Sequence, residues 1–179
     1  CATFTERTKD ELIHPEYKTQ RNFLQTNADM WMKLNKQNNM HGDSIFIPVV
    51  VHVLWHNPVE NISDEQIFSQ IKVLNEDFNS LNADTIKTPA YYKPLRGKTN
   101  FYFRLAKQDP DGLATSGINR VHTDIDSGFG LDGKINFTKF GGQDPWDPRY
   151  YVNIYVCVLY ESSNTFAVTY FPEIGRAHV

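Results

Sequence analysis

A nearly unbroken apolar run, Ile45–Trp55, constrains the fold of this chain more than any other stretch of its sequence. The run has 11 residues, is broken only by Pro48 and His52, and consists mainly of β-branched and aromatic side chains. A helix that crosses a membrane needs about 20 apolar residues, so the run is too short to span a bilayer. A short β-branched run of this kind is typical of a central strand that is covered on both faces. We therefore expect the main domain to be built around this strand.

The segment after this strand carries the signals of an amphipathic helix. Ser63 and Gln66 are spaced as a capping box, in which the Ser63 hydroxyl accepts from the Gln66 N–H and the Gln66 side chain reaches back. Apolar residues then recur every three or four positions, which places them on one stripe of a helix. They are Ile67, Ile71, Leu74 and Phe78.

Alternating apolar and polar residues predict further strands downstream. The chain turns at Asp109–Gly112, where each residue type suits a tight turn, and Asp124–Pro148 is rich in loop-forming residues. A strand, a helix and then several strands indicate an α/β domain, in which a twisted mixed sheet is backed by one long helix. The predicted strands cover Phe101–Ala106, Ile118–His122, Tyr151–Leu159 and Thr165–Phe171.

Residues 1–44 differ in character from the rest, being polar and rich in Lys, Asn and Gln. Pro15 suits the first turn of a helix, and apolar residues then recur at helical spacing. We therefore predict a helix from about Glu16 to about Gln37. Asn38–Ser44 is predicted to be an exposed linker. The chain thus divides into a helical segment with its linker, residues 1–44, and a main domain, residues 45–179.

The charge pattern makes nucleic acid an unexpected partner. The 179 residues carry 18 basic and 21 acidic side chains, for a formal net charge of −3, and the two signs are interleaved. No run of Lys and Arg forms the basic stripe that is typical of nucleic-acid binding. A hydrophobic fraction of 40% is sufficient for a folded core.

The histidines do not predict a metal site. His52 and His56 have the four-residue spacing of zinc ligands on a helix, but in a strand that spacing separates them by about 13 Å, too far for one metal ion. Each is therefore predicted to be a core or rim residue. The other histidines stand singly among turn or linker residues: His14, His41, His122 and His178.

Three aspartates in the loop-rich stretch, Asp124, Asp126 and Asp132, are reminiscent of a calcium-binding loop. An EF-hand loop needs a third acidic or amide residue where Gly128 stands and a bidentate Glu where Ile135 stands. The pattern therefore favours a solvated loop.

The two cysteines, Cys1 and Cys157, leave the redox compartment undecided. Cys157 lies on a predicted buried strand and is expected to be a small apolar core residue. The sequence leaves open whether the two cysteines form a disulfide. A chain that begins with Cys1 rather than Met is expected to be a fragment or a processed form.

A set of short motifs follows in a fixed order between residues 45 and 172. They are Ile47–Val53, Ile62–Ile67, Leu74–Phe78, Asn82–Asp84, Phe103–Ala106, Asp109–Gly112, Gly117–Arg120, Gly141–Trp146 and Tyr151–Cys157. In this order they resemble the opening of the pappalysin family of metzincin zinc metallopeptidases. No single motif is diagnostic, and the collinear order carries the resemblance.

The resemblance implies the upper half of a metzincin catalytic domain, preceded by a helical pro-segment in residues 1–44. In that family a later helix carries H-E-x-x-H-x-x-G-x-x-H, whose imidazoles bind the zinc cofactor and whose Glu is the general base. This motif does not occur in the 179 residues. We therefore expect an inactive fragment of a secreted or cell-surface zinc endopeptidase that acts on proteins or peptides. The family's substrate-facing edge strand corresponds to the last predicted strand, with Val168, Thr169 and Tyr170 as the expected substrate-binding residues.

Cys1 is the metal ligand that the resemblance implies in this chain. Pappalysin relatives with a short pro-segment use the Cys of a Cys-Gly-Thr triplet to ligate the zinc and stay latent; here the triplet is Cys1-Ala2-Thr3. A thiolate is a strong zinc ligand and occupies the position that a catalytic water needs. Ala2 departs from the family's Gly and removes some backbone freedom. Two alternatives stay open. Cys1 is an inert thiol, or it carries a lipid that anchors a non-catalytic surface lipoprotein domain. A membrane is expected as a partner only if Cys1 is lipidated.

Overall fold

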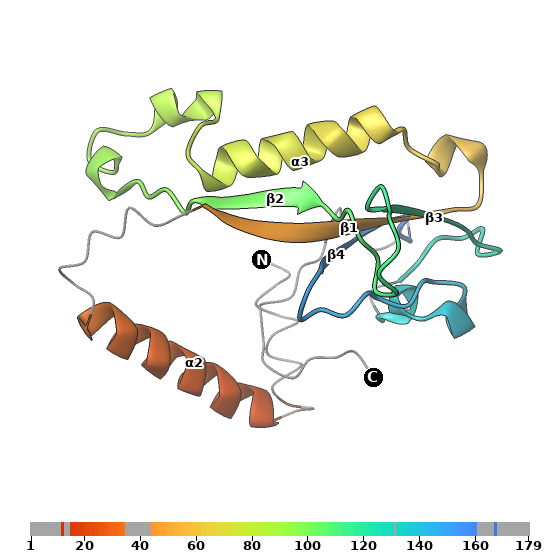
Figure 1. Cartoon of the computed structure of the whole chain (residues 1–179), viewed down its shortest axis with the longest axis horizontal. Helices are drawn as coiled ribbons and strands as arrows, with labels where there is room; N and C mark the ends of the chain where they lie inside the picture. The colour runs from red at the N-terminus through yellow and green to blue at the C-terminus, as the bar shows by residue number, and fades with distance from the viewer. Residues whose placement is uncertain (1–11, 13–14, 35–43, 131, 161–166, 168–179) are drawn as a thin grey trace. The chain divides into compact units, whose positions relative to one another are not determined.

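The computed structural model describes residue 12 and residues 15–34, 44–130, 132–160 and 167. The chain separates into two units, one made of residues 1–41 and 164–179 and the other of residues 42–163. Figure 1 labels the helices and strands of both. We describe each unit by itself.

The described part of the first unit is essentially one helix, α2, which covers Pro15–Leu34. It confirms the helix predicted from the spacing of apolar residues, and the predicted end at Gln37 lies outside the described residues. Within α2, the Thr26 hydroxyl donates to the Asn22 carbonyl at 2.7 Å. No helix in the described part of the chain is long and apolar enough to cross a membrane.

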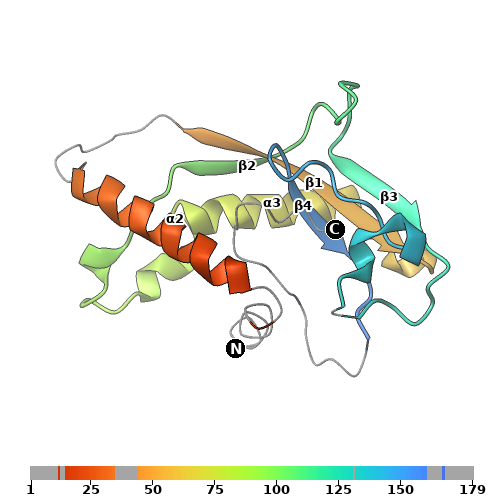
Figure 2. The same cartoon turned by 90° about the horizontal axis from the view of Figure 1, so that it is seen from below.

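The second unit is built on a four-stranded sheet, in which the other three strands all pair in parallel with the longest strand, β1. Strand β2 pairs with the first half of β1 and strand β3 with its second half. Because β4 pairs with residues of β1 that also pair with β2 or β3, it takes one edge of β1, and β2 and β3 follow one another along the other. Figure 2 labels the four strands. Strand β4 pairs with the middle of β1. The strands cover Ile45–Trp55 (β1), Phe101–Leu105 (β2), Ile118–His122 (β3) and Val152–Val156 (β4).

The point where the partner of β1 changes from β2 to β3 depends on Gly117. Ala106 N–H donates to the Val49 carbonyl at 2.8 Å, and Val51 N–H donates to the Gly117 carbonyl at 2.9 Å, so the two strands meet within one step along β1. Gly117 has a φ of +75°, and a Cβ there would lie 2.6 Å from the Ala106 nitrogen. Only glycine fits both the left-handed backbone and this close approach.

The core of the second unit lies between the sheet and helix α3, which covers Asp64–Phe78. Figure 1 shows α3 running along one face of β1 and β2. Alternate residues of β1 point toward the helix, and the predicted stripe of α3 packs on them. The buried cluster consists of Val49, Val51, Val53, Ile67 and Phe103, with Ile71 and Leu74 packed against it.

Asn75 of α3 and Asn79, which follows the last residue of that helix, cap the outer edge of β2. Asn75 accepts from the Phe103 N–H at 2.7 Å and donates to the Phe103 carbonyl at 2.9 Å. Asn79, which is buried, donates to the Phe101 carbonyl at 2.8 Å. An open strand edge invites pairing with another chain, so these side chains protect the sheet at this edge.

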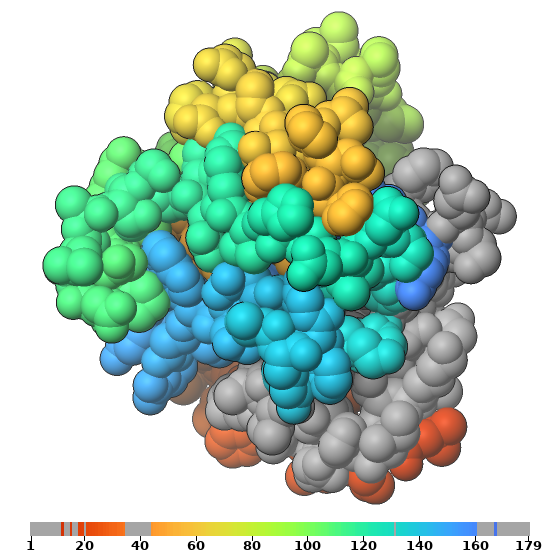
Figure 3. Space-filling model, turned by 90° about the vertical axis from the view of Figure 1, so that its right-hand side faces the viewer, coloured from red at the N-terminus to blue at the C-terminus, as the bar shows by residue number. Residues whose placement is uncertain are grey.

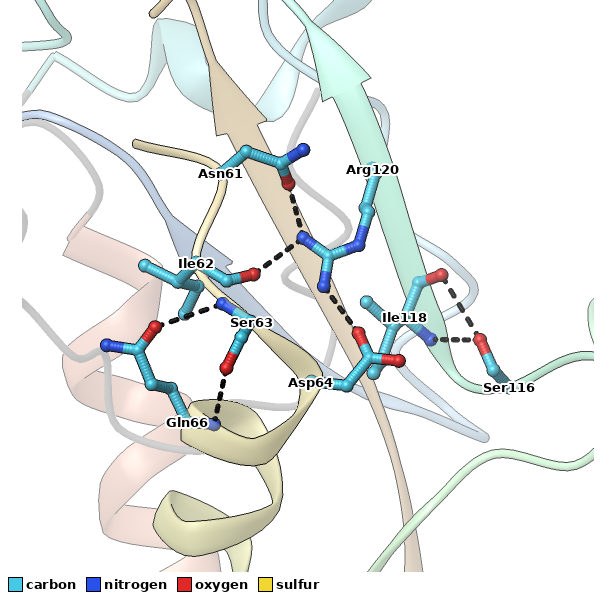
Figure 4. A network of polar contacts seen from close by, with 8 residues as sticks. All are labelled: Asn61, Ile62, Ser63, Asp64, Gln66, Ser116, Ile118 and Arg120. Atoms are coloured by element: carbon cyan, nitrogen blue, oxygen red, sulfur yellow. Dashed lines mark hydrogen bonds and ion pairs between the residues drawn. The ribbon is translucent and has the colours of Figure 1, made fainter. Parts of the chain in front are cut away.

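The start of α3 is fixed to β3 by Arg120 (Figure 4). Its guanidinium donates to the side chains of Asn61 and Asp64 and, at 2.7 Å, to the Ile62 carbonyl. The predicted capping box is confirmed, because the Ser63 hydroxyl accepts from the Gln66 N–H and Gln66 reaches back to the Ser63 N–H. The helix therefore begins where the sequence indicates and is held there by the sheet.

The connections contain short 3-10 turns rather than further strands or long helices. The stretch between β3 and β4 forms much of one side of the second unit, in teal and cyan below the yellow atoms of α3 (Figure 3). The turns cover Pro58–Glu60, Ala83–Lys87, Lys93–Leu95, Lys134–Asn136 and Thr138–Phe140.

These observations confirm the predicted α/β class and its single backing helix. The strand predicted over Tyr151–Leu159 is shorter in the structure, because beyond Val156 the backbone leaves β1. Phe129 N–H donates to the Val158 carbonyl at 2.8 Å, and Phe129 forms an isolated bridge with Leu159. The predicted strand Thr165–Phe171 lies outside the described residues, apart from Ala167.

Candidate functional site

Polar and aromatic side chains gather on the face of the sheet opposite α3. The register pairs His52 of β1 with Asn119 of β3 on one side and with Tyr155 of β4 on the other. Because side chains alternate along a strand, all three point away from the α3 face, and Asn153 does so too. Together with Trp146 from the preceding loop, these four residues form what we call the His52 cluster.

The hydrogen bonds of the cluster define the tautomer of His52. Asn153 Oδ1 accepts from the Trp146 N–H at 2.8 Å, which identifies this atom as the amide oxygen. His52 Nε2, 2.9 Å from the same oxygen, therefore carries the proton and donates. His52 Nδ1 then accepts from the Asn119 amide at 3.2 Å. Both ring nitrogens of this buried histidine are satisfied in its neutral form.

The cluster also clamps the loop before β4 onto the sheet. The Asn153 amide donates back to the Trp146 carbonyl at 2.8 Å, so one side chain pairs with both backbone groups of that residue. The Tyr155 hydroxyl donates to the Gln143 carbonyl at 3.0 Å. The rings of Tyr155 and His52 stack at 4.7 Å. The result is a loop fixed at two points, Gln143 and Trp146, over a rigid strand.

Burial determines the electrostatics of this face. Desolvation lowers the pKa of His52, and the hydrogen bond with Asn153 opposes this only in part. Desolvation also raises the pKa of Tyr155 and raises the pKa of Cys157 to about 11. At neutral pH the cluster and the Cys157 thiol are therefore uncharged, and neither ring nitrogen of His52 is free. The chemistry of the cluster is that of a positioning network rather than of a nucleophile or a base.

We expect the free energy of unfolding to decrease as the pH falls below 6.5, the ordinary pKa of histidine. Folded His52 takes up its proton at a lower pH than unfolded His52, so below 6.5 the unfolded state binds more protons. One group contributes a slope of at most about 1.4 kcal/mol per pH unit. The rings and amides that face His52 from β3, β4 and the loop do not titrate in this range.

Urea unfolding at a series of pH values measures this slope. His52→Phe should be less stable throughout but should lose the part of the slope that His52 contributes. His122→Gln, which leaves His52 in place, should keep it. Equal slopes in the protein and in His52→Phe would contradict the assignment.

The histidines and aspartates that were weighed from the sequence as metal ligands do not come together. His52 is a core residue, as predicted, and His56 is half-buried at the end of β1, where its Nδ1 lies 2.9 Å from the Thr123 carbonyl. Asp126 lies 3.7 Å from His56 Nε2, whereas Asp132 pairs with Lys134 at 2.7 Å. Within residues 15–34, 44–130 and 132–160, no three His, Cys, Asp or Glu side chains are placed to hold a metal ion. The described residues therefore do not fit a zinc site.

The remaining predicted site residues are not tested by the structure. Cys1 and the substrate-binding candidates Val168, Thr169 and Tyr170 lie outside the described residues. Cys157 is a free thiol, half-buried rather than in the core as predicted. The sequence did not predict the roles of Asn119, Trp146, Asn153 and Tyr155. For Asn153 and Tyr155, the polar positions of the predicted strand at 151–159 were the available signal.

The fold is that of the upper subdomain of metzincin-type metallopeptidases. Solved structures that share it include those of mirolysin, in its mature form and as its precursor promirolysin. Mirolysin in complex with a compound is 46% identical over 66% of this chain, with a TM-score of 0.64. Mature mirolysin of Tannerella forsythia with a cleaved peptide is 45% identical over 64% of this chain, with a TM-score of 0.61. A mutant of promirolysin from the same organism is 38% identical over 83% of this chain, with a TM-score of 0.67.

The chain spans less than half the length of these structures, between 42% and 47% of each. No family profile matches the chain. No curated protein sequence matches it either. The similarity therefore supports a metallopeptidase at the metzincin level.

Proposed function

We propose that this chain is the N-terminal part of a secreted, latent zinc metalloendopeptidase of the pappalysin type. Residues 1–44 are its pro-segment, and residues 45–179 are the upper part of its catalytic domain. Since the 179 residues contain no H-E-x-x-H motif and the described ones hold no metal cluster, the main zinc ligands belong to other parts of the parent protein. The chain by itself is then inactive.

One observation carries this proposal. The promirolysin structure covers 83% of this chain, whereas the two mature structures cover 66% and 64%. The additional share is what a pro-segment at one end of the chain would contribute. The identity of 38–46% further supports a shared function in the parent, beyond a shared fold.

The described residues supply a rigid support for peptide binding. Helix α3 and the core fix β1, and the His52 cluster fixes the loop around Trp146 against the same sheet. A sheet that is held from both faces keeps its edges in place, and an extended peptide can add to such an edge as a further strand. The cleaved peptide bound by mature mirolysin supports peptides as partners here.

A second candidate function is that of a non-catalytic surface lipoprotein domain, anchored to a membrane through a lipid on Cys1. This candidate predicts membrane attachment through Cys1 and no protease activity in the parent.

Replacement of Cys1 by Ala in the precursor that contains this chain tests both candidates. If Cys1 is the latency ligand, Cys1→Ala should keep its zinc and gain peptidase activity or cleave itself between residues 38 and 44, because water gains access to the metal. If Cys1 carries a lipid, the same change should release the protein from the membrane fraction and leave its activity unchanged. Zinc content, peptide hydrolysis and membrane partition are measured together.

The 179-residue chain and the Cys157→Ala precursor are the controls. The chain alone should contain no stoichiometric zinc and cleave no peptide, and Cys157→Ala should behave as the unmodified precursor. A Cys1→Ala precursor with the same peptidase activity and the same membrane partition as the unmodified precursor would exclude both candidates and leave Cys1 as an inert thiol. Stoichiometric zinc in the chain, lost on replacing His52 and His56, would refute its proposed inactivity.

A further inference from the structure

Residues 81–98 form a lobe that projects beyond the end of α3, drawn in yellow-green in Figure 1, and we call it the tyrosine lobe. Its neck is closed by two contacts. The Ser80 hydroxyl donates to the Gly97 carbonyl at 2.5 Å, and the Thr99 hydroxyl donates to the Phe78 carbonyl at 3.0 Å. Compact loops whose ends are held together in this way are frequently functional.

The burial pattern of the tyrosine lobe is inverted. Its less exposed positions are polar, namely Asn82, Thr85 and Thr88. Five of its exposed positions are large and apolar or aromatic, with exposed fractions from 56% to 80%: Leu81, Ile86, Tyr91, Tyr92 and Leu95. A loop adapted only to water places such side chains inward, and a group of exposed apolar side chains marks an interaction surface.

The charge of the lobe differs in sign from that of the whole chain. The lobe carries four basic residues and one acidic residue, within a chain of formal net charge −3. The single carboxylate, on Asp84, is paired with Lys87 at 2.6 Å. Lys93, Arg96 and Lys98 are exposed and have no ion pair within the described part of the chain. These three cations lie beside the tyrosines in the sequence.

We propose that the tyrosine lobe docks on a lipid membrane with an anionic surface. Exposed aliphatic side chains insert into the apolar region, tyrosines prefer the interface with water, and Lys and Arg bind anionic headgroups. The projection of the lobe and its outward-pointing side chains favour a flat lipid surface over a protein partner. The docking needs no lipid on Cys1 and does not depend on the proposed peptidase function.

Sedimentation with lipid vesicles tests the proposal, using the chain produced without a signal peptide so that Cys1 carries no lipid. The chain should bind vesicles of phosphatidylcholine mixed with phosphatidylglycerol, should not bind phosphatidylcholine alone, and should dissociate in high salt. Lys93→Gln/Arg96→Gln should weaken binding about 30-fold. Tyr91→Ser/Leu95→Ser should weaken it at least roughly tenfold, because apolar area no longer inserts.

The matched controls carry the same substitutions at exposed sites outside the lobe. Lys72→Gln/Lys107→Gln and Val59→Ser/Leu113→Ser should bind as the unmodified chain does, with circular dichroism confirming that every variant is folded. Binding that survives both lobe variants would overturn the proposal, as would no binding to anionic vesicles. Binding to polyglutamate without binding to vesicles would assign an acidic protein partner instead, and dimer formation abolished by the lobe variants would assign a second copy.

Discussion

Replacement of Gly142 by Ala is expected to prevent stable folding of the second unit. A Cβ at this position would lie 2.1 Å from the Ile135 carbonyl oxygen and 2.8 Å from the Lys134 oxygen. Both atoms belong to the backbone of a neighbouring turn, so no side-chain rotation relieves the clash. Separating the two segments would break the bond between Gln143 N–H and the Ile135 carbonyl, 2.9 Å long. We expect the free energy of unfolding to fall by about 4 kcal/mol or more.

Urea unfolding followed by tryptophan fluorescence measures this loss. Gly97→Ala is the matched control, because a Cβ there meets nothing within 4 Å and its φ is not positive. That control should change the free energy of unfolding by less than about 1 kcal/mol, and it should stabilise if it changes anything. A Gly142→Ala protein as stable as the Gly97→Ala control would show that the turn at Ile135 moves freely.

The elements that the sequence predicted well are those whose signals are local. The Ser63–Gln66 capping box concerns residues three apart, and the structure forms it with the predicted partners. The run Ile45–Trp55 identified a central strand because burial on both faces requires apolar residues throughout, and Val49–Leu54 are all buried. In each case the physical requirement is met within one segment.

Features that depend on pairing between distant segments were not predictable in the same way. The alignment of β2 and β3 along one edge of β1 depends on Gly117, and a single glycine does not indicate which strands meet at it. Asn75 and Asn79 cap the edge of β2. In the sequence they are two polar residues beside an apolar stripe, which is also the pattern of a solvated helix face.

The His52 cluster also depends on pairing between distant segments, so the sequence predicted it only in part. His52 was predicted as a core or rim residue, because the spacing of a strand places it too far from His56 to share a metal ion. Its partners Asn119, Asn153 and Tyr155 come from two other strands, and only the register brings them together. Alternation along β4 was visible in the sequence, but it indicates equally a face exposed to water. The half-buried amides of Asn119 and Asn153 distinguish the two cases, and the burial of a side chain is known only from the three-dimensional structure.

Asn153→Leu is expected to release the loop around Trp146 from the sheet. Leucine has nearly the same volume but removes the partner of three polar groups, the N–H and carbonyl of Trp146 and the Nε2–H of His52, and also a longer bond, 3.4 Å, to the Tyr151 carbonyl. An unpaired polar group costs about 1–3 kcal/mol when it is buried, and these are partly buried, so we expect a total loss of about 3 kcal/mol in the free energy of unfolding. Asn119→Leu, the same exchange on the neighbouring strand, removes one longer bond to His52 and should cost about 1 kcal/mol.

Hydrogen exchange distinguishes loss of the clamp from general destabilisation. In Asn153→Leu, the amides of Gln143, Asp144 and Trp146 should exchange much faster at a denaturant concentration where the amides of β1 stay protected, whereas Asn119→Leu should leave the loop protected. The comparison is informative because both variants lose a contact with His52 and only one of them loses the two backbone bonds to Trp146. If both variants exchange alike in this loop, Asn153 is not the clamp, and the rings of Tyr155 and Trp146 must hold the loop against the sheet instead.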